Sequence, residues 1–120
     1  GCWSATLLAP LGTTLAITPV KGQMLLFKAP IGLIGPMILD QGRYLIPRRD
    51  GRVVTGSTLE QAGYDKTPTT AARADLKSAA VALVPALADY PIEHHWAGLR
   101  PSSPGGIPFI GPHPDIGGLY

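Results

Sequence analysis

The 120-residue sequence contains few residues of several kinds, and each shortage excludes a class of protein. Cys2 is the single cysteine, so no internal disulfide can form, which favours a reducing, cytoplasmic location. Charged residues make up 15% of the chain, against about 25% in a typical domain, and the formal net charge is only +2. Because no basic run alternates with aromatic residues, the sequence does not indicate nucleic-acid binding. No apolar run approaches the ~20 residues of a membrane-spanning helix.

The shortage of charge also concerns the surface. A chain with so few charges is expected to cover part of its surface with another domain, and to self-associate when that domain is removed. It opens on "GCWS" without the charged start of a signal peptide and stops on "GGLY". We therefore expect it to be a piece of a larger protein.

Glycine and proline, in contrast, are plentiful, with fifteen and thirteen residues, and they indicate many turns and short strands. Residues 19–28, "PVKGQMLLFK", predict a strand in which Gly22 marks a bulge or a close approach to the backbone. Gly35 and Pro36 interrupt the apolar stretch 32–39, which therefore predicts an edge strand.

Residues 67–90 form the one long helical pattern. Thr69 or Thr70 can cap its start, and Pro85 should kink or shorten its last turns. An apolar stripe recurs at helical spacing through Leu76, Ala80, Leu83, Val84 and Leu87. With the strands, this helix predicts an α+β fold in which an antiparallel or mixed sheet has one long helix packed on one face.

A hairpin is predicted in "RYLIPRRDGRVVTGSTL", residues 43–59. Asp50-Gly51 is the preferred pair for a two-residue type I′ turn, which would pair Arg49 with Arg52 and Tyr44 with Ser57. Since side chains alternate between the faces of a strand, one face should then carry Tyr44, Ile46, Arg48, Val53, Thr55, Ser57 and Leu59.

The next strand, "PIEHHWAGLR" at 91–100, ends on an arginine. Alternation places Arg100 on one face with His94, Trp96 and Gly98, and the glycine leaves a notch beside the guanidinium. Burying a guanidinium is costly unless an anion meets it. That anion is either a bound carboxylate, which matches the fork of an arginine, or an internal acid such as Asp65 or Glu60.

Other reactive residue types do not form a site. His94 and His95 are adjacent, so they point to opposite strand faces, and His113 is distant, which makes a metal site improbable. Cys2 has no nearby histidine partner and is interpreted as a small buried apolar residue. The glycine clusters match no phosphate-binding fingerprint. No catalytic residue is therefore assigned.

Four segments resemble the D-amino-acid oxidase family of FAD-dependent oxidoreductases. They are "PVKGQ" at 19–23, "YLIPRRDGRVVTGSTLEQAGYDK" at 44–66, "WAGLRP" at 96–101 and "IPFIGPHPDIGGLY" at 107–120. "GCWS" is similar to the Gly-Ala-Trp-Ser that follows a strand of the FAD domain in that family. Within it, the sequence looks nearest to the glycine oxidases of bacterial thiamine biosynthesis.

The resemblance implies a reaction and a site. Such enzymes move a hydride from the α-carbon of an amino acid to FAD, and dioxygen then reoxidises the flavin to give hydrogen peroxide. It implies that Arg100 binds the substrate carboxylate and that Tyr44 and Leu59 line the substrate cavity. Leu59 stands where the most similar glycine oxidases can have methionine. The match of "GCWS" implies that Gly1 lies beside the cofactor.

The same resemblance implies a division of the chain. Residues 1–18 would connect from an FAD-binding domain outside the sequence, 19–112 would be the substrate-binding domain, and 113–120 would return to the FAD-binding domain. The chain alone is then expected neither to retain FAD nor to oxidise glycine. Three alternatives stay open: an oxidase of sarcosine or D-amino acids, a dehydrogenase that passes electrons to a quinone, and a binding module without catalysis.

Overall fold

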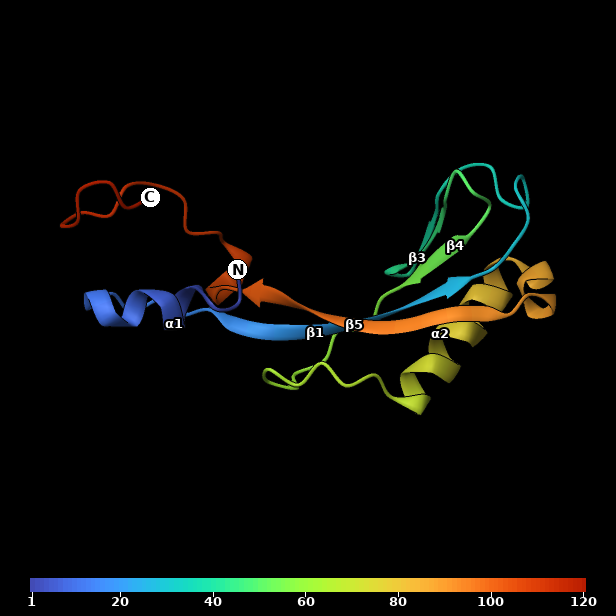
Figure 1. The fold of residues 1–120 in the computed structure, drawn as a ribbon, viewed down its shortest axis with the longest axis horizontal. Coiled ribbons are helices and arrows are strands. Elements are labelled where there is room, and N and C mark those ends of the chain that lie inside the picture. Colours follow the sequence, from blue (N-terminus) through green and yellow to red (C-terminus); the bar gives the residue numbers. More distant parts are fainter.

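The computed structural model describes residues 1–120, and its central feature is a five-stranded antiparallel sheet in the order β2-β3-β4-β1-β5. The strands are β1 (Thr18–Phe27), β2 (Ile38–Asp40), β3 (Arg43–Pro47), β4 (Val53–Gly56) and β5 (Ile92–Ser102). The helices are α1 (Ser4–Leu8) and α2 (Thr70–Leu83), with short 3₁₀ turns at Ala9–Leu11, Pro85–Asp89 and Pro104–Gly106. Helix α2 packs against the sheet (Figure 1), so the predicted α+β fold is confirmed.

The molecule is elongated. It measures 56 × 27 × 23 Å, and its radius of gyration is 18.2 Å, whereas a compact chain of this length has a radius of about 14 Å. Strands β1 and β5 run through most of its length, with α2 and the hairpin β3-β4 at one end and α1 with the C-terminal tail at the other (Figure 1). No helix is long and apolar enough to cross a membrane.

Helix α2 follows the signals in its sequence. Thr69 is the N-cap, and its Oγ1 accepts a hydrogen bond from the backbone N–H of Ala72 (3.3 Å). The helix ends at Leu83 because Pro85 cannot continue its hydrogen-bond ladder. Its buried residues are Ala72, Leu76 and Ala80. The predicted cap and the shortening at Pro85 are thus confirmed. The helix is shorter than the predicted 67–90, because Val84 of the predicted stripe is the C-cap and Leu87 lies in the 3₁₀ turn that follows.

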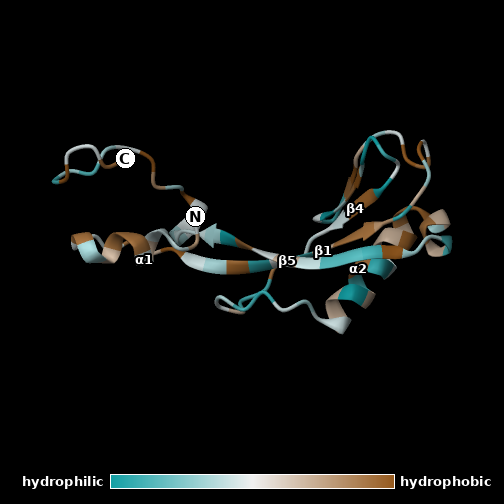
Figure 2. Cartoon of the chain, in the orientation of Figure 1, coloured by the Kyte–Doolittle hydropathy of each residue, from teal (hydrophilic) through white to brown (hydrophobic).

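The hydrophobic core lies between α2 and one face of the sheet. Its buried members are Leu25, Phe27, Ala29, Ile34, Leu45, Val53, Leu76, Ala80 and Leu87. The other end of the molecule has no such core, and Figure 2 shows hydrophobic segments along α1 and the C-terminal tail. Large apolar side chains are exposed there, among them Leu7, Leu11, Ile107, Phe109 and Ile110. Exposed apolar side chains gathered in this way are typical of a surface that contacts another protein or domain.

The predicted hairpin register is wrong by one residue. Tyr44 pairs with Gly56 and Leu45 with Thr55, because the turn has three residues, 49–51, and not two. Gly51 N–H donates to the carbonyl of Arg48 (3.0 Å), and only Gly51 in this turn has a positive φ, of 91°. A type I′ turn needs two such residues. Val53 and Thr55 therefore point into the core, on the face opposite Tyr44.

The type I′ geometry occurs one hairpin earlier. Gln41 and Gly42 both have positive φ, 44° and 77°, and they join β2 to β3 with Asp40 paired to Arg43. Strand β2 is the edge of the sheet, as predicted for residues 32–39. Of that predicted range, only Ile38 and Leu39 belong to the strand.

Candidate substrate site

The sheet has one face covered by α2 and one open face, and the strand register decides which side chains reach each. Arg100 pairs with Val20, Gly98 with Gly22, and Trp96 with Met24, so these residues share a face. Met24 also pairs with Gly56, whose other neighbour is Tyr44. The alternating residues Lys21, Gln23, Leu25 and Phe27 of β1 are buried on the opposite face. Arg100 and Tyr44 therefore lie on the same open face.

Arg100 extends across β1 and lies over Gly22. A Cβ at Gly22 would be only 2.2 Å from Nη1 of Arg100, so the prediction of a close approach at this glycine is confirmed. Nη2 donates to Oγ of Ser57 (2.6 Å), and Nη1 makes a longer contact to the carbonyl oxygen of Thr58 (3.4 Å). No carboxylate pairs with this guanidinium. Its charge thus lacks an internal counterion.

Two glycines shape the surface around the guanidinium. A Cβ at Gly98 would have nothing within 4 Å, so the predicted notch beside Arg100 is open space. Gly56, in contrast, is covered, because the hydroxyl of Tyr44 lies 2.6 Å from the position of its missing Cβ. The open face therefore carries a phenol, a cation and an unfilled notch, with Trp96 37% exposed beside them.

Leu59 reaches this face by a route that the predicted register did not contain. Strand β4 ends at Gly56, and the chain then pairs again with β1 through a bridge between Glu60 and Lys21. Glu60 points to the covered side, where its carboxylate lies 3.8 Å from Nζ of Lys21. Alternation then turns Leu59 to the open side, where it is 78% exposed.

The two acids considered as partners of Arg100 belong to another cluster. Glu60 and Asp65 each lie 3.8 Å from Nζ of Lys21, which is only 2% exposed. The same Nζ donates to the carbonyl of Thr67 (2.5 Å). Lys21 lies on the covered face, so Glu60 and Asp65 do not pair with Arg100. The predicted alternative of an internal acid as the partner of Arg100 is wrong.

The pKa of the Glu60 carboxyl is lowered, mainly by the hydrogen bond from the Thr58 hydroxyl and further by Gln23 and the charge of Lys21. The unfolded chain therefore binds this proton first, so the stabilisation is complete above the ordinary value of 4.5 and is lost as the pH falls through the lower folded value. As the pH falls below 4.5, we expect the melting temperature of the full-length protein to decrease steeply, and that of Glu60→Gln to decrease less steeply. Equal slopes for both proteins would contradict this role.

Ser57 and Gly22 are the site residues that sequence reasoning did not assign. A glycine inside a strand was the available signal for Gly22, whereas Ser57 depends on the chain path after β4, which no local pattern specifies.

His94 and His95 lie on opposite faces, as predicted. Cys2 is buried, also as predicted. No three metal-ligating side chains gather anywhere in residues 1–120.

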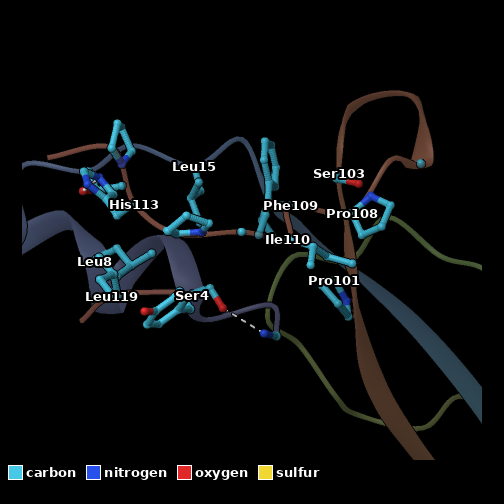
Figure 3. Close-up of a pocket in the computed structure, with 18 residues that line it drawn as sticks. Ser4, Leu8, Leu15, Pro101, Ser103, Pro108, Phe109, Ile110, His113 and Leu119 are labelled. Carbon is cyan, nitrogen blue, oxygen red and sulfur yellow. Dashed lines mark hydrogen bonds between the residues drawn. The ribbon is translucent and has the colours of Figure 1, made fainter. Parts of the chain in front are cut away.

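A separate cavity of about 590 Å³ lies at the end of the molecule that carries α1 and the C-terminal tail. It is bounded by α1, the segment that follows α1, and that tail (Figure 3). Gly1 lines it, and the nitrogen of Gly1 donates to Oγ of Ser4 (2.8 Å). Nε2 of His113 hydrogen bonds with the Thr13 hydroxyl at 2.8 Å, which fastens the tail to the N-terminal segment. Gly1 lines this cavity, whereas Arg100, Tyr44 and Leu59 do not.

The sheet therefore has one face covered by α2 and one open face that carries an arginine without an internal counterion. The chain belongs to a known family: a family model described as FAD dependent oxidoreductase matches residues 1–120.

Among curated proteins, the chain is 54% identical to a glycine oxidase of Pseudomonas aeruginosa and 56% identical to one of Pseudomonas putida, over all of its 120 residues. Among solved structures, a glycine oxidase from Geobacillus kaustophilus superposes with a TM-score of 0.92 at 31% identity, over 99% of this chain. An iminodiacetate oxidase from Chelativorans has a TM-score of 0.89 at 31% identity over the same share. The chain spans about a third of the length of these relatives: 33% of each Pseudomonas protein, 32% of the first structure and 33% of the second.

The family implies FAD as the cofactor of the whole protein. Side chains leave the sheet surface uncovered at Gly98, where a Cβ would meet nothing within 4 Å. The sequence contains no G-x-G-x-x-G turn for the pyrophosphate. These residues therefore do not suit the site that holds the FAD phosphates.

Proposed function

We propose that this chain is the substrate-binding portion of an FAD-dependent oxidase that acts on glycine or another small amino acid. The observation that carries the proposal is the Arg100 guanidinium, which faces the open side of the sheet without a carboxylate partner. A rigid fork of N–H donors matches a carboxylate in two parallel hydrogen bonds. The names of the relatives support a small amino acid as the source of that carboxylate.

The residues on the open face would orient the substrate. Arg100 would hold its carboxylate, and Tyr44 and Leu59 would limit the space around its α-carbon. FAD, when bound, would accept the hydride that leaves the α-carbon, and dioxygen, as the final electron acceptor, would be reduced to hydrogen peroxide. No general base is needed in this scheme, because the rate depends on holding the reacting atoms in place.

The proposed division of the chain follows from the same assignment. Residues 1–18 would connect from an FAD-binding domain, 19–112 would form the substrate-binding domain, and 113–120 would return to the FAD-binding domain. β1 begins at Thr18, which supports the first boundary. Gly1, which lines the cavity between α1 and the C-terminal tail, would contact the cofactor.

The first test compares the full-length protein with residues 1–120 alone. We expect the full-length protein to contain FAD and to release hydrogen peroxide when it oxidises glycine in air. The isolated chain should show no flavin absorbance after purification, because it lacks the turn for the pyrophosphate. Stoichiometric flavin in the isolated chain would contradict the proposed division.

The choice of substrate needs a separate comparison, because the fold is shared with proteins that are named for other substrates. An L-proline dehydrogenase from P. horikoshii superposes with a TM-score of 0.86 at 27% identity. We expect glycine to be oxidised more efficiently than sarcosine, D-alanine or proline. A full-length protein that oxidises none of these amino acids, with oxygen or with a quinone, would favour a binding module instead.

A further inference from the structure

Arg100 makes its shortest hydrogen bond to the side chain of another residue. Ser57 accepts from Nη2 at 2.6 Å, whereas the contact from Nη1 to the Thr58 carbonyl is 3.4 Å. A guanidinium has five N–H donors in a fixed plane. A short bond at one corner therefore restricts how that plane can turn, and it leaves other donors for a ligand.

Ser57 is itself fixed from the covered side of the sheet. Its carbonyl accepts from Nη1 of Arg43 (2.5 Å), and Nη2 of the same arginine pairs with Asp75 of α2 at 2.5 Å. Arg43 thus ties the end of β4 to the helix that packs on the other face. The backbone at Ser57 is held while its hydroxyl reaches Arg100.

The residues that follow Ser57 are held as well. Oγ1 of Thr58 accepts from the backbone N–H of Gln23 (2.9 Å), and its hydroxyl donates to Glu60. The Gln23 amide also donates to Glu60 (2.8 Å) and is fully buried. Because these bonds fix the chain on both sides of the hydroxyl, Ser57 is pre-organised for its bond to Arg100.

We propose that Ser57 is a positioning residue, which sets the orientation of the Arg100 guanidinium and thereby the affinity for the substrate carboxylate. This inference rests on the proposed function, since it assumes that Arg100 binds that carboxylate. Ser57 does not touch the reacting atoms in this assignment. It acts through Arg100, and Arg43 supports it from the covered side.

The test is a comparison of Ser57→Ala, Ser57→Thr and the control Ser102→Ala in the full-length protein. Ser102 is a half-buried serine of β5, two residues after Arg100, so it controls for the loss of a hydroxyl from this region. The readouts are the affinity for acetate, followed by perturbation of the flavin spectrum, the KM and kcat for glycine, and the melting temperature.

We expect Ser57→Ala to weaken acetate binding and raise the KM for glycine about tenfold, because a hydrogen bond to a charged group is lost. The kcat should change less than KM, and flavin content and melting temperature should stay near those of the parent protein. Ser57→Thr retains the hydroxyl and should restore most of the affinity. Ser102→Ala should bind acetate as the parent protein does.

Several outcomes would overturn the inference. An unchanged acetate affinity in Ser57→Ala would show that Arg100 is oriented without Ser57. A fall in flavin content or melting temperature that accounts for the weaker binding would make Ser57 a structural residue. A parent protein that binds no acetate and oxidises no amino acid would instead reject the proposed function on which the inference depends.

Discussion

Replacing Arg100 with alanine should weaken the binding of amino-acid substrates by about 10- to 150-fold, since hydrogen bonds to a charged group contribute about 1.5–3 kcal/mol. A bidentate contact with the carboxylate would remove two such hydrogen bonds at once, so values at the upper end are expected. Arg100→Lys keeps the charge but loses the planar fork, and its affinity should lie between those of the parent protein and Arg100→Ala. Steady-state KM and the binding of acetate are the measurements.

The stability of the Arg100 variants separates a binding role from a structural one. Arg100 pairs with no acid, so its removal leaves no unpaired buried carboxylate behind. The melting temperature of Arg100→Ala should therefore remain close to that of the parent protein. Lys21, whose removal would leave Glu60 and Asp65 without their shared cation, offers the opposite case. A variant at Arg100 that binds substrates normally would remove this residue from the site.

The elements that local sequence specifies were predicted well. Helix α2 is set by a capping threonine, a stripe of apolar residues and a proline, all of which act within a few residues of one another. The role of Gly22 could also be predicted. A glycine inside a strand costs stability, so its presence often indicates that another group lies close to the backbone there. In the structure, that neighbour is the Arg100 guanidinium.

The hairpin register was predicted wrongly because Asp50-Gly51 is compatible with two turns. In the observed turn only Gly51 takes a positive φ, so no aspartate has to adopt the left-handed region. Oδ1 of Asp50 accepts from the backbone N–H of Arg52 (3.2 Å), and Oδ2 accepts from its guanidinium, which stabilises this longer loop. A register shift of one residue exchanges the two faces of a strand, and Val53 and Thr55 were therefore placed on the wrong side.

The arrangement of the open face could not be derived from local patterns. Strand β1 lies between β4 and β5, so Arg100 meets Ser57 only after strands far apart in the sequence are paired. The wrong register still placed Tyr44 and Leu59 on one face, because the change of pairing after Gly56 compensates for the error at the turn. Likewise, only the three-dimensional fold shows that Glu60 and Asp65 pair with Lys21 and not with Arg100.

Gly22→Ala should reduce substrate affinity about 10- to 100-fold while it leaves the fold intact, because the new methyl group and the guanidinium cannot share one place. A Cβ at this position would lie 2.2 Å from Nη1 of Arg100 and 2.7 Å from both Cζ and Nη2. All three atoms belong to the end of a flexible side chain, so the arginine can swing away and the backbone need not move. Arg100 would keep its charge but lose its position over β1, together with its short bond to Ser57.

This variant distinguishes the position of the charge from its presence. If a positive charge near the site were sufficient, Gly22→Ala would bind acetate and glycine as the parent protein does, and the proposed geometry would be rejected. Gly35→Ala is the matched control, since a Cβ there has nothing within 4 Å and the residue lies outside the site. We expect that control to match the parent protein in affinity, and both variants to match it in flavin content and melting temperature. Gly22→Ala should also resemble Arg100→Ala more closely than Arg100→Lys, because displacing the fork removes the bidentate contact that the lysine variant partly replaces.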